Sequence, residues 1–89
     1  MRAVISVIGR DKKGIIAKVS GCLYNIGVNI EDISQTIMGE LFTMIMMVDL
    51  SESKAGISDV NSLLQKIAAE MKVEIRLQNE EIFNIMHKI

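Results

Sequence analysis

The residues best suited to chemistry lie in one short polar loop, Gly9-Arg10-Asp11-Lys12-Lys13-Gly14. The loop follows an apolar run, Ala3–Ile8, and precedes a stretch whose apolar residues recur at helical spacing. A loop that leads into a helix presents backbone N–H groups without intrahelical partners, next to the positive end of the helix dipole. Such a place suits a bound carboxylate or phosphate. The loop is therefore the first candidate for a ligand site.

Two interpretations of this loop stay open at the level of the sequence. In the first, Asp11 caps the helix that follows, and Gly9 and Gly14 only shape the turn. In the second, the backbone amides bind a ligand and Asp11 receives its ammonium group. One loop can serve both purposes, although the residue pattern alone favours capping.

The remaining polar residues are weaker candidates. Asn29 follows Gly27 and Val28 at the start of a predicted strand. There an asparagine either bonds its own backbone or contacts a ligand that lies against the strand. Glu31 and Asp32 are adjacent, and adjacent strand residues point to opposite faces, so they make a poor acid–base pair. We expect no metal site at these carboxylates.

Cysteine and histidine usage argues against catalysis. Cys22 is the single cysteine and lies on the apolar stripe of the first predicted helix, so we expect it to be a buried small residue. It cannot form an internal disulfide, which fits a reducing cytoplasm. His87 has no cluster of partner ligands in the sequence. We therefore expect no catalytic residue, no metal ion and no cofactor.

Length and charge narrow the class of protein further. The 89 residues are expected to form one domain, 1–89, with 49% apolar and 24% charged residues. The formal net charge is −1, and two adjacent lysines do not make a basic patch, so neither nucleic acid nor a membrane surface is an expected partner. The longest apolar runs fall short of the roughly 18–20 residues that span a bilayer.

Apolar periodicity predicts four strands and three helices. The second strand changes the parity of its apolar residues, which predicts a bulge near Glu31 and Asp32. Leu41–Leu50 is apolar enough to be helical by periodicity alone, but the preceding turn and its residue types favour a strand. Gly27 is the expected left-handed residue after the first helix. The expected strands are Arg2–Ile8, Val28–Ile37, Leu41–Leu50 and Val73–Gln78, and the expected helices are Lys12–Ile26, Val60–Met71 after a cap at Ser58 or Asp59, and Glu80–Ile89.

The order βαββαβ predicts an α+β, ferredoxin-like fold, which is a four-stranded antiparallel sheet with two helices on one face, here followed by a short C-terminal helix. Right-handed crossovers place strands one and three at the centre. Both central strands have apolar residues of both parities, so the second face of the sheet must also be covered. We expect the terminal helix to cover part of that face and a second copy of the chain to cover the rest, as a homodimer.

Motifs and topology together resemble the ACT domain, a small amino-acid-sensing module, over nearly the whole chain. The resemblance rests on Val7-Ile8-Gly9, on Asp11-Lys12-Lys13-Gly14-Ile15 and on Gly27-Val28-Asn29-Ile30. As a short, stand-alone ACT domain, the chain is similar to the UPF0237 family, and the similarity includes Ile33-Ser34-Gln35-Thr36 and the terminal helix with Ile82-Phe83. That family is in turn similar to the ACT repeats of the glycine cleavage system transcriptional repressor. Lys13 replaces a proline that is common in ACT domains, which leaves the loop less rigid.

The resemblance implies that an amino acid lies between this loop of one domain and the second strand of a neighbour. Carried over to this sequence, it implicates Asp11, Gly14, Ile15, Asn29 and Ile30. Loop amides would hold the ligand carboxylate, Asp11 or Asn29 would meet its ammonium group, and Gly14 would allow close approach of the backbone. The implied function is non-enzymatic and regulatory, in a homodimer that signals to a separate protein partner.

The alternative is a small enzyme of the same architecture, an acylphosphatase-type hydrolase, in which Arg10 and Asn29 would fill the substrate-binding roles. The sequence lacks the longer glycine-rich loop of that family, and Arg10 comes earlier in the loop than that family's arginine does. A metallochaperone of this topology needs Cys-x-x-Cys in the loop, which is absent. An RNA-binding module needs aromatic residues on the central strands, where Phe42 stands alone.

Overall fold

A computed structural model describes residues 1–10 and 13–87, with side chains described as far as residue 85. The predicted element order is confirmed, and the predicted end of the last helix at Ile89 lies outside the described residues. In chain order the elements are β1 (Arg2–Gly9), α1 (Ile15–Asn25), β2 (Asn29–Met38), β3 (Leu41–Asp49), α2 (Ile57–Met71), β4 (Glu74–Asn79) and α3 (Glu80–His87).

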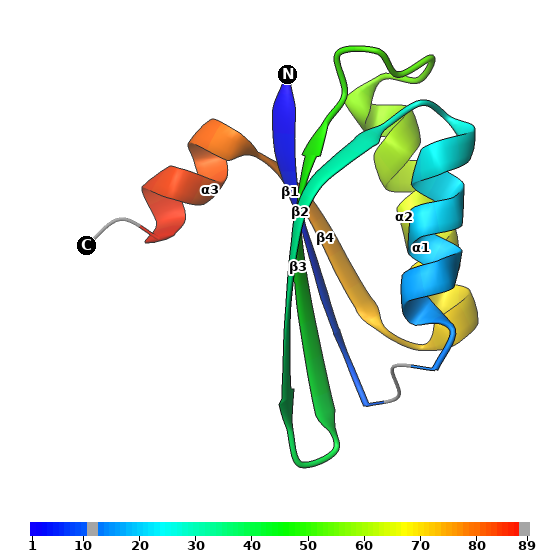
Figure 1. The fold of residues 1–89 in the computed structure, drawn as a ribbon, viewed down its shortest axis with the longest axis vertical. Coiled ribbons are helices and arrows are strands. Elements are labelled where there is room, and N and C mark those ends of the chain that lie inside the picture. Colours follow the sequence, from blue (N-terminus) through cyan, green and yellow to red (C-terminus); the bar gives the residue numbers. More distant parts are fainter. Residues whose placement is uncertain (11–12, 88–89) are drawn as a thin grey trace.

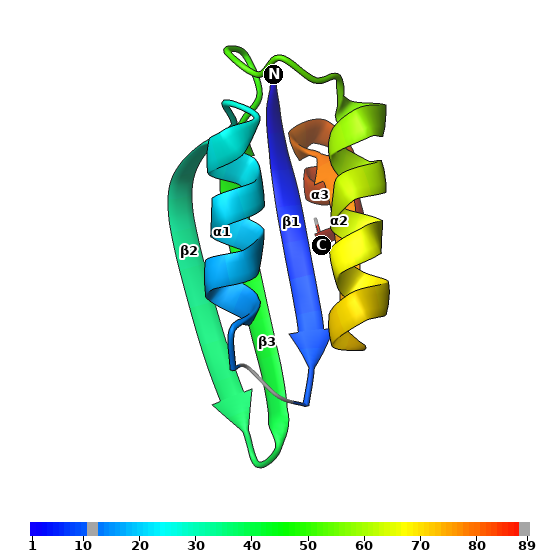
Figure 2. The ribbon, with the colours of Figure 1, turned by 90° about the vertical axis from the view of Figure 1, so that its right-hand side faces the viewer.

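The four strands form one antiparallel sheet in the order β2-β3-β1-β4. Helices α1 and α2 cover one side of it, which we call the helix face, while α3 lies on the opposite side, the far face (Figures 1 and 2). β1 and β3 are central, as predicted, and β2 and β4 are the edge strands. The ferredoxin-like fold is therefore confirmed.

The hydrophobic core fills the space between the sheet and α1 and α2. Side chains alternate along a strand, so every second residue of β1 and β3 points to the helix face and is buried. The assignment of Leu41–Leu50 to a strand is thereby confirmed for Leu41–Asp49. The core includes Ala3, Ile5 and Val7 of β1, Phe42, Met44, Met46 and Val48 of β3, Ile15, Val19 and Leu23 of α1, and Val60, Leu64 and Ile67 of α2.

Glycines set both ends of α1. The helix begins at Ile15, with Gly14 as N-cap at φ 79, so the predicted start at Lys12 is wrong. The predicted N-cap, Asp11, lies outside the described residues. The left-handed backbone of Gly14 is incompatible with a helix interior, so it delays the start. At the other end Gly27 has φ 78, its N–H donates to the Tyr24 carbonyl (3.2 Å), and the Val28 N–H donates to the Leu23 carbonyl (2.9 Å). This is a Schellman motif, and the prediction for Gly27 is confirmed.

Helix α2 also begins earlier than predicted. Its N-cap is Gly56, which has an extended backbone and no side chain to accept a hydrogen bond. Ser58 and Asp59, the predicted capping residues, lie inside the first turn, so that prediction is wrong. The acidic Asp59 there interacts favourably with the positive end of the helix dipole without capping it.

The predicted bulge is present near the start of β2. The register passes from Ile30 opposite Val48 directly to Asp32 opposite Met47, which leaves Glu31 without a partner residue in β3. Glu31 accepts a hydrogen bond from Arg2 Nε at 2.9 Å. The bulge explains the parity change in the sequence, because it returns Ile33 and Ile37 to the same face of the sheet as Ile30.

Replacing Lys72 with glycine is expected to raise the free energy of unfolding by about 1 kcal/mol. Lys72 ends α2 with φ 58, and within the described ranges it is the one non-glycine residue with a positive φ. Its side chain is exposed, so the change costs no buried contact. A denaturation curve should show a rise in Tm of about 4–8 °C. Lys72→Ala keeps the strain and is the matched control; equal stability of the glycine and alanine variants would contradict the prediction.

Candidate functional site

The loop after β1 and the start of β2 lie at opposite ends of the domain. β1 runs down to the loop, α1 returns along the sheet, and β2 begins at the far end of α1 (Figure 2). The 11 residues of α1 span roughly 16 Å at 1.5 Å per residue. One chain therefore does not bring Gly14 and Ile15 together with Asn29 and Ile30.

The half of the site at the loop consists of backbone groups. Gly14 is exposed, and its carbonyl accepts the Lys18 N–H at 3.0 Å. Because Gly14 has no side chain, the N-cap residue itself leaves the first N–H groups of α1 uncapped. The side chain of Ile15 is completely buried, so only its backbone N–H can serve a ligand. Asp11, the other predicted residue of this half, lies outside the described residues.

Gly9 holds the beginning of the loop against the connection between α2 and β4. A Cβ added to Gly9 would lie 2.5 Å from Cγ1 of Val73 and 3.2 Å from its Cβ. Only glycine therefore fits between β1 and Val73 without displacement. The sequence shows Gly9 as a turn residue, and nothing in it signals this contact, because Val73 is distant along the chain.

The half of the site at β2 stands at the open edge of the sheet. Asn29 is exposed, and its register partner is Asp49. Ile30 is half-buried against the core under α1. Ser51 donates to Asp49 from its backbone N–H and from its hydroxyl, both at 3.0 Å, and these hydrogen bonds hold the pKa of the Asp49 carboxyl below its ordinary value.

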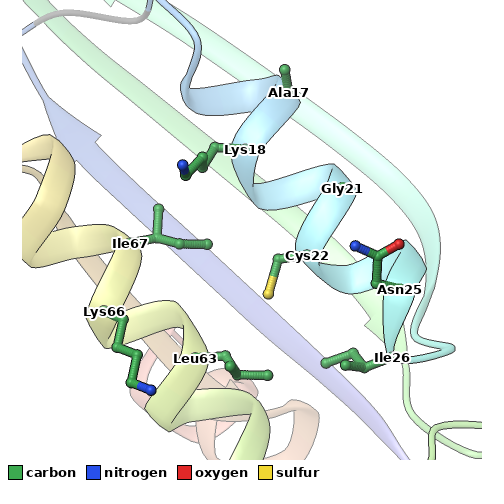
Figure 3. A pocket seen from close by; sticks show the side chains of 9 residues that line it. All are labelled: Ala17, Lys18, Gly21, Cys22, Asn25, Ile26, Leu63, Lys66 and Ile67. Atoms are coloured by element: carbon green, nitrogen blue, oxygen red, sulfur yellow. The ribbon is translucent and has the colours of Figure 1, made fainter.

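An apolar groove of about 540 Å³ lies between α1 and α2, apart from both halves of the candidate site (Figure 3). Cys22 lines it, and burial raises the pKa of the Cys22 thiol, which disfavours the nucleophilic thiolate. The side chain is half-buried, so the expectation of a buried cysteine is met only in part. The lining residues are Ala17, Lys18, Gly21, Cys22, Asn25, Ile26, Leu63, Lys66 and Ile67, of which Lys18 forms an ion pair with Glu70 at 3.1 Å.

The described residues of the groove and of the loop do not form a metal-binding set. Among the described residues, no group of three or more His, Cys, Asp or Glu side chains could hold a metal ion. Arg10 follows β1 at the loop end, whereas Asn29 stands at the other end of α1, so the two residues of the hydrolase alternative do not converge within a chain. Within the same residues, no helix is long and apolar enough to cross a bilayer.

The fold and the loop before α1 define an ACT domain. The family model described as "ACT domain" matches residues 2–78 of the chain. ACT domains are small regulatory ligand-binding modules, and this chain is one of them. More narrowly, it belongs to the UPF0237 family: a UPF0237 protein of Clostridium acetobutylicum is 49% identical over 89 residues, which is 100% of each chain.

Solved structures agree with this assignment. An ACT domain protein from Streptococcus pneumoniae superposes with a TM-score of 0.81 at 40% identity and covers 93% of this chain and 93% of its own. A putative glycine cleavage system transcriptional repressor superposes with a TM-score of 0.72 at 24% identity, over 86% of this chain and 44% of its own. The second likeness shows the shared fold.

Proposed function

We propose that the protein binds a small amino acid between the Gly9–Gly14 loop of one copy and β2 of a second copy, within a homodimer. The observation that carries the proposal is the position of β2. It is an edge strand of 10 residues, and its outer side has no strand partner in the described chain. An unpaired edge of this length is a ready template for another strand.

Two-fold symmetry at this edge would unite the two halves of the site. If β2 pairs antiparallel with its copy, the start of one β2 lies beside the end of the other. The loop and the start of α1 belong to that same end of the domain (Figure 2). Asn29 and Ile30 of one copy would then approach Gly14 and Ile15 of the other. The symmetry would generate two equivalent sites.

The groups at such a site match the ends of a free amino acid. The first N–H groups of α1, which the Gly14 N-cap cannot bond with a side chain, and the positive end of the helix dipole would bind the α-carboxylate. Asp11 or the exposed Asn29 amide would receive the α-ammonium group. Gly14 lets the ligand approach the backbone closely, because it has no Cβ. The described groups of the site are binding groups, which supports a protein that acts by binding, in the reducing cytoplasm that its single Cys22 favours.

Regulation would follow from a difference in affinity. A ligand shifts an equilibrium only if it binds one state better than the other. An amino acid that bridges two copies binds the paired state and not the separated one, so it would stabilise the dimer. A separate protein that recognises the dimer would then respond to the amino acid concentration.

A thermal-denaturation screen of the protein against the twenty amino acids tests the proposal. A ligand at about 100 times its Kd stabilises the folded state by about 2.7 kcal/mol, which raises the Tm of a domain of this size by about 10 °C or more. Asp11→Ala and Asn29→Ala should abolish the shift. Asp59→Ala and Asn61→Ala change the same residue types on α2, away from the site, and should keep it. No shift with any amino acid, or an undiminished shift in both site variants, would contradict the proposal.

A further inference from the structure

The far face of the sheet is half covered. Val4 points away from α1 and α2, yet it is only 1% exposed, because α3 packs across β1 and β4 at that end of the sheet (Figure 1). Ile8 points to the same face at the other end of β1 and is 40% exposed. The chain therefore covers one end of its far face and leaves the other open.

The open end presents an apolar patch, which consists of Ile8, Met38, Leu41 and Ile45. The four side chains are between 39% and 71% exposed. They share a face because Met38 pairs with Leu41, and because Leu41 and Ile45 alternate with the buried residues of β3. None of the four is charged, so water contact with this end of the sheet is costly.

Helix α3 has a second apolar side that its own chain leaves unused. Ile82 and Ile85 are 49% and 74% exposed, whereas the outer side of a surface helix is ordinarily polar. The helix is nevertheless held firmly at its start. The Asn79 side-chain oxygen accepts the Ile82 N–H at 2.8 Å, and Glu80 pairs with Arg2 at 3.1 Å.

We propose that the far face binds the far face of a second copy, so that α3 of each chain covers the apolar patch of the other. The arrangement fits because α3 stands at one end of the far face and the β2–β3 hairpin, with the patch, at the other (Figure 1). Consider a two-fold axis that lies parallel to the plane of the sheet and perpendicular to its strands. Rotation about this axis places the α3 end of one far face against the hairpin end of the other. Each helix then meets one patch, and the contact closes on itself as a dimer.

Charges at the border of the patch are complementary in the same arrangement. Arg76 lies opposite Ser6 in the register, so it borders the patch on the far face. Glu81 lies in the first turn of α3. Both side chains are exposed, and in the described part of the chain neither takes part in an ion pair. The two-fold symmetry brings Glu81 of one copy to the β4 side of the other copy's far face, where Arg76 lies.

This interface is independent of the ligand site proposed above, because it leaves the β2 edge free. An assembly that uses the far face alone contains two chains, and one that also pairs the β2 edges contains four. The two proposals can therefore fail separately.

Light scattering after size-exclusion chromatography tests the far-face interface. Ile85→Glu and Ile45→Glu place a charge on the helix and on the patch, and each should halve the molar mass of the wild-type assembly. Tyr24→Glu changes an exposed residue of α1 and should leave the mass unchanged. Ile85→Glu should also keep any amino-acid-induced shift in Tm, because the β2 edge is intact. A wild-type monomer, or an unchanged mass in both interface variants, would overturn the proposal.

Cross-linking by disulfides tests which residues meet. In a Cys22→Ser background, chains with Ile85→Cys and chains with Ile8→Cys are mixed and oxidised. We expect the yield of covalent dimer from the mixture to be much greater than the yield from either variant alone. In the control, chains with Tyr24→Cys are mixed with chains with Ile8→Cys, and this mixture should give no more covalent dimer than either variant alone. An equal yield with the control partner would refute the exchange of α3 across the far face.

Discussion

Phe42→Ala is expected to lower the free energy of unfolding by about 3–5 kcal/mol. The Phe42 side chain is 1% exposed and lies on the helix face of β3, directly opposite Gly9. Its removal leaves a cavity next to a residue without a side chain, so neighbouring atoms cannot collapse into it easily. Domains of this size have a total stability of about 5–13 kcal/mol, so the loss is a large share of the whole.

Urea denaturation measures this loss as a lower midpoint at an unchanged m-value. Phe42→Leu keeps most of the apolar volume and should cost far less. Tyr24→Ala removes a strongly exposed aromatic ring and should change stability by no more than about 0.5 kcal/mol. A Phe42→Ala variant within 1 kcal/mol of the wild type would show that the core repacks freely around β3.

Gly9→Ala is expected to cost about 1–3 kcal/mol of unfolding free energy, because the new methyl group would overlap Val73. Val73→Ala removes Cγ1, the atom that would overlap the new methyl group, so the double variant should be more stable than the sum of the two single effects predicts. Gly21→Ala is the matched control. Its Cβ meets no atom within 4 Å, and alanine is the better helix former, so stability should rise by about 1 kcal/mol.

A double-mutant cycle from urea denaturation gives the coupling between positions 9 and 73. The expected coupling is at least about 0.5 kcal/mol in favour of the double variant. Additive effects would mean that β1 and the connection after α2 shift apart at no cost, and that Gly9 is not a fixed point for the loop that follows it.

The fold could be predicted from the sequence because its signals are local. Alternation assigns the strands, the parity change at Ile30 and Ile33 reveals the bulge, and Gly27 marks the end of α1. Right-handed crossovers then fix the strand order. The predicted starts of α1 and α2 were wrong because residues that can cap, such as Ser58, are common outside caps, whereas the N-caps are Gly14 and Gly56, which only the backbone geometry reveals.

The candidate site could be predicted less completely, because its halves depend on distances that a sequence does not contain. Gly14 and Asn29 are close along the chain, yet the length of α1 separates them in space. Likewise, the contact between Gly9 and Val73 joins residues that are far apart in the sequence. Local patterns identify such residues as special without revealing what each one meets.

The central position of β1 has a consequence for how the chain folds during synthesis. Of the four strands in this sheet, β1 is made first, yet one of its two partners is β4, the last of the four; Ala3 pairs with Asn79. Contacts between residues so distant in sequence slow folding, because the loop between them must close before they form. β1 therefore leaves the ribosome before β4 and keeps one side unpaired until β4 is made, which exposes this strand to aggregation during that interval.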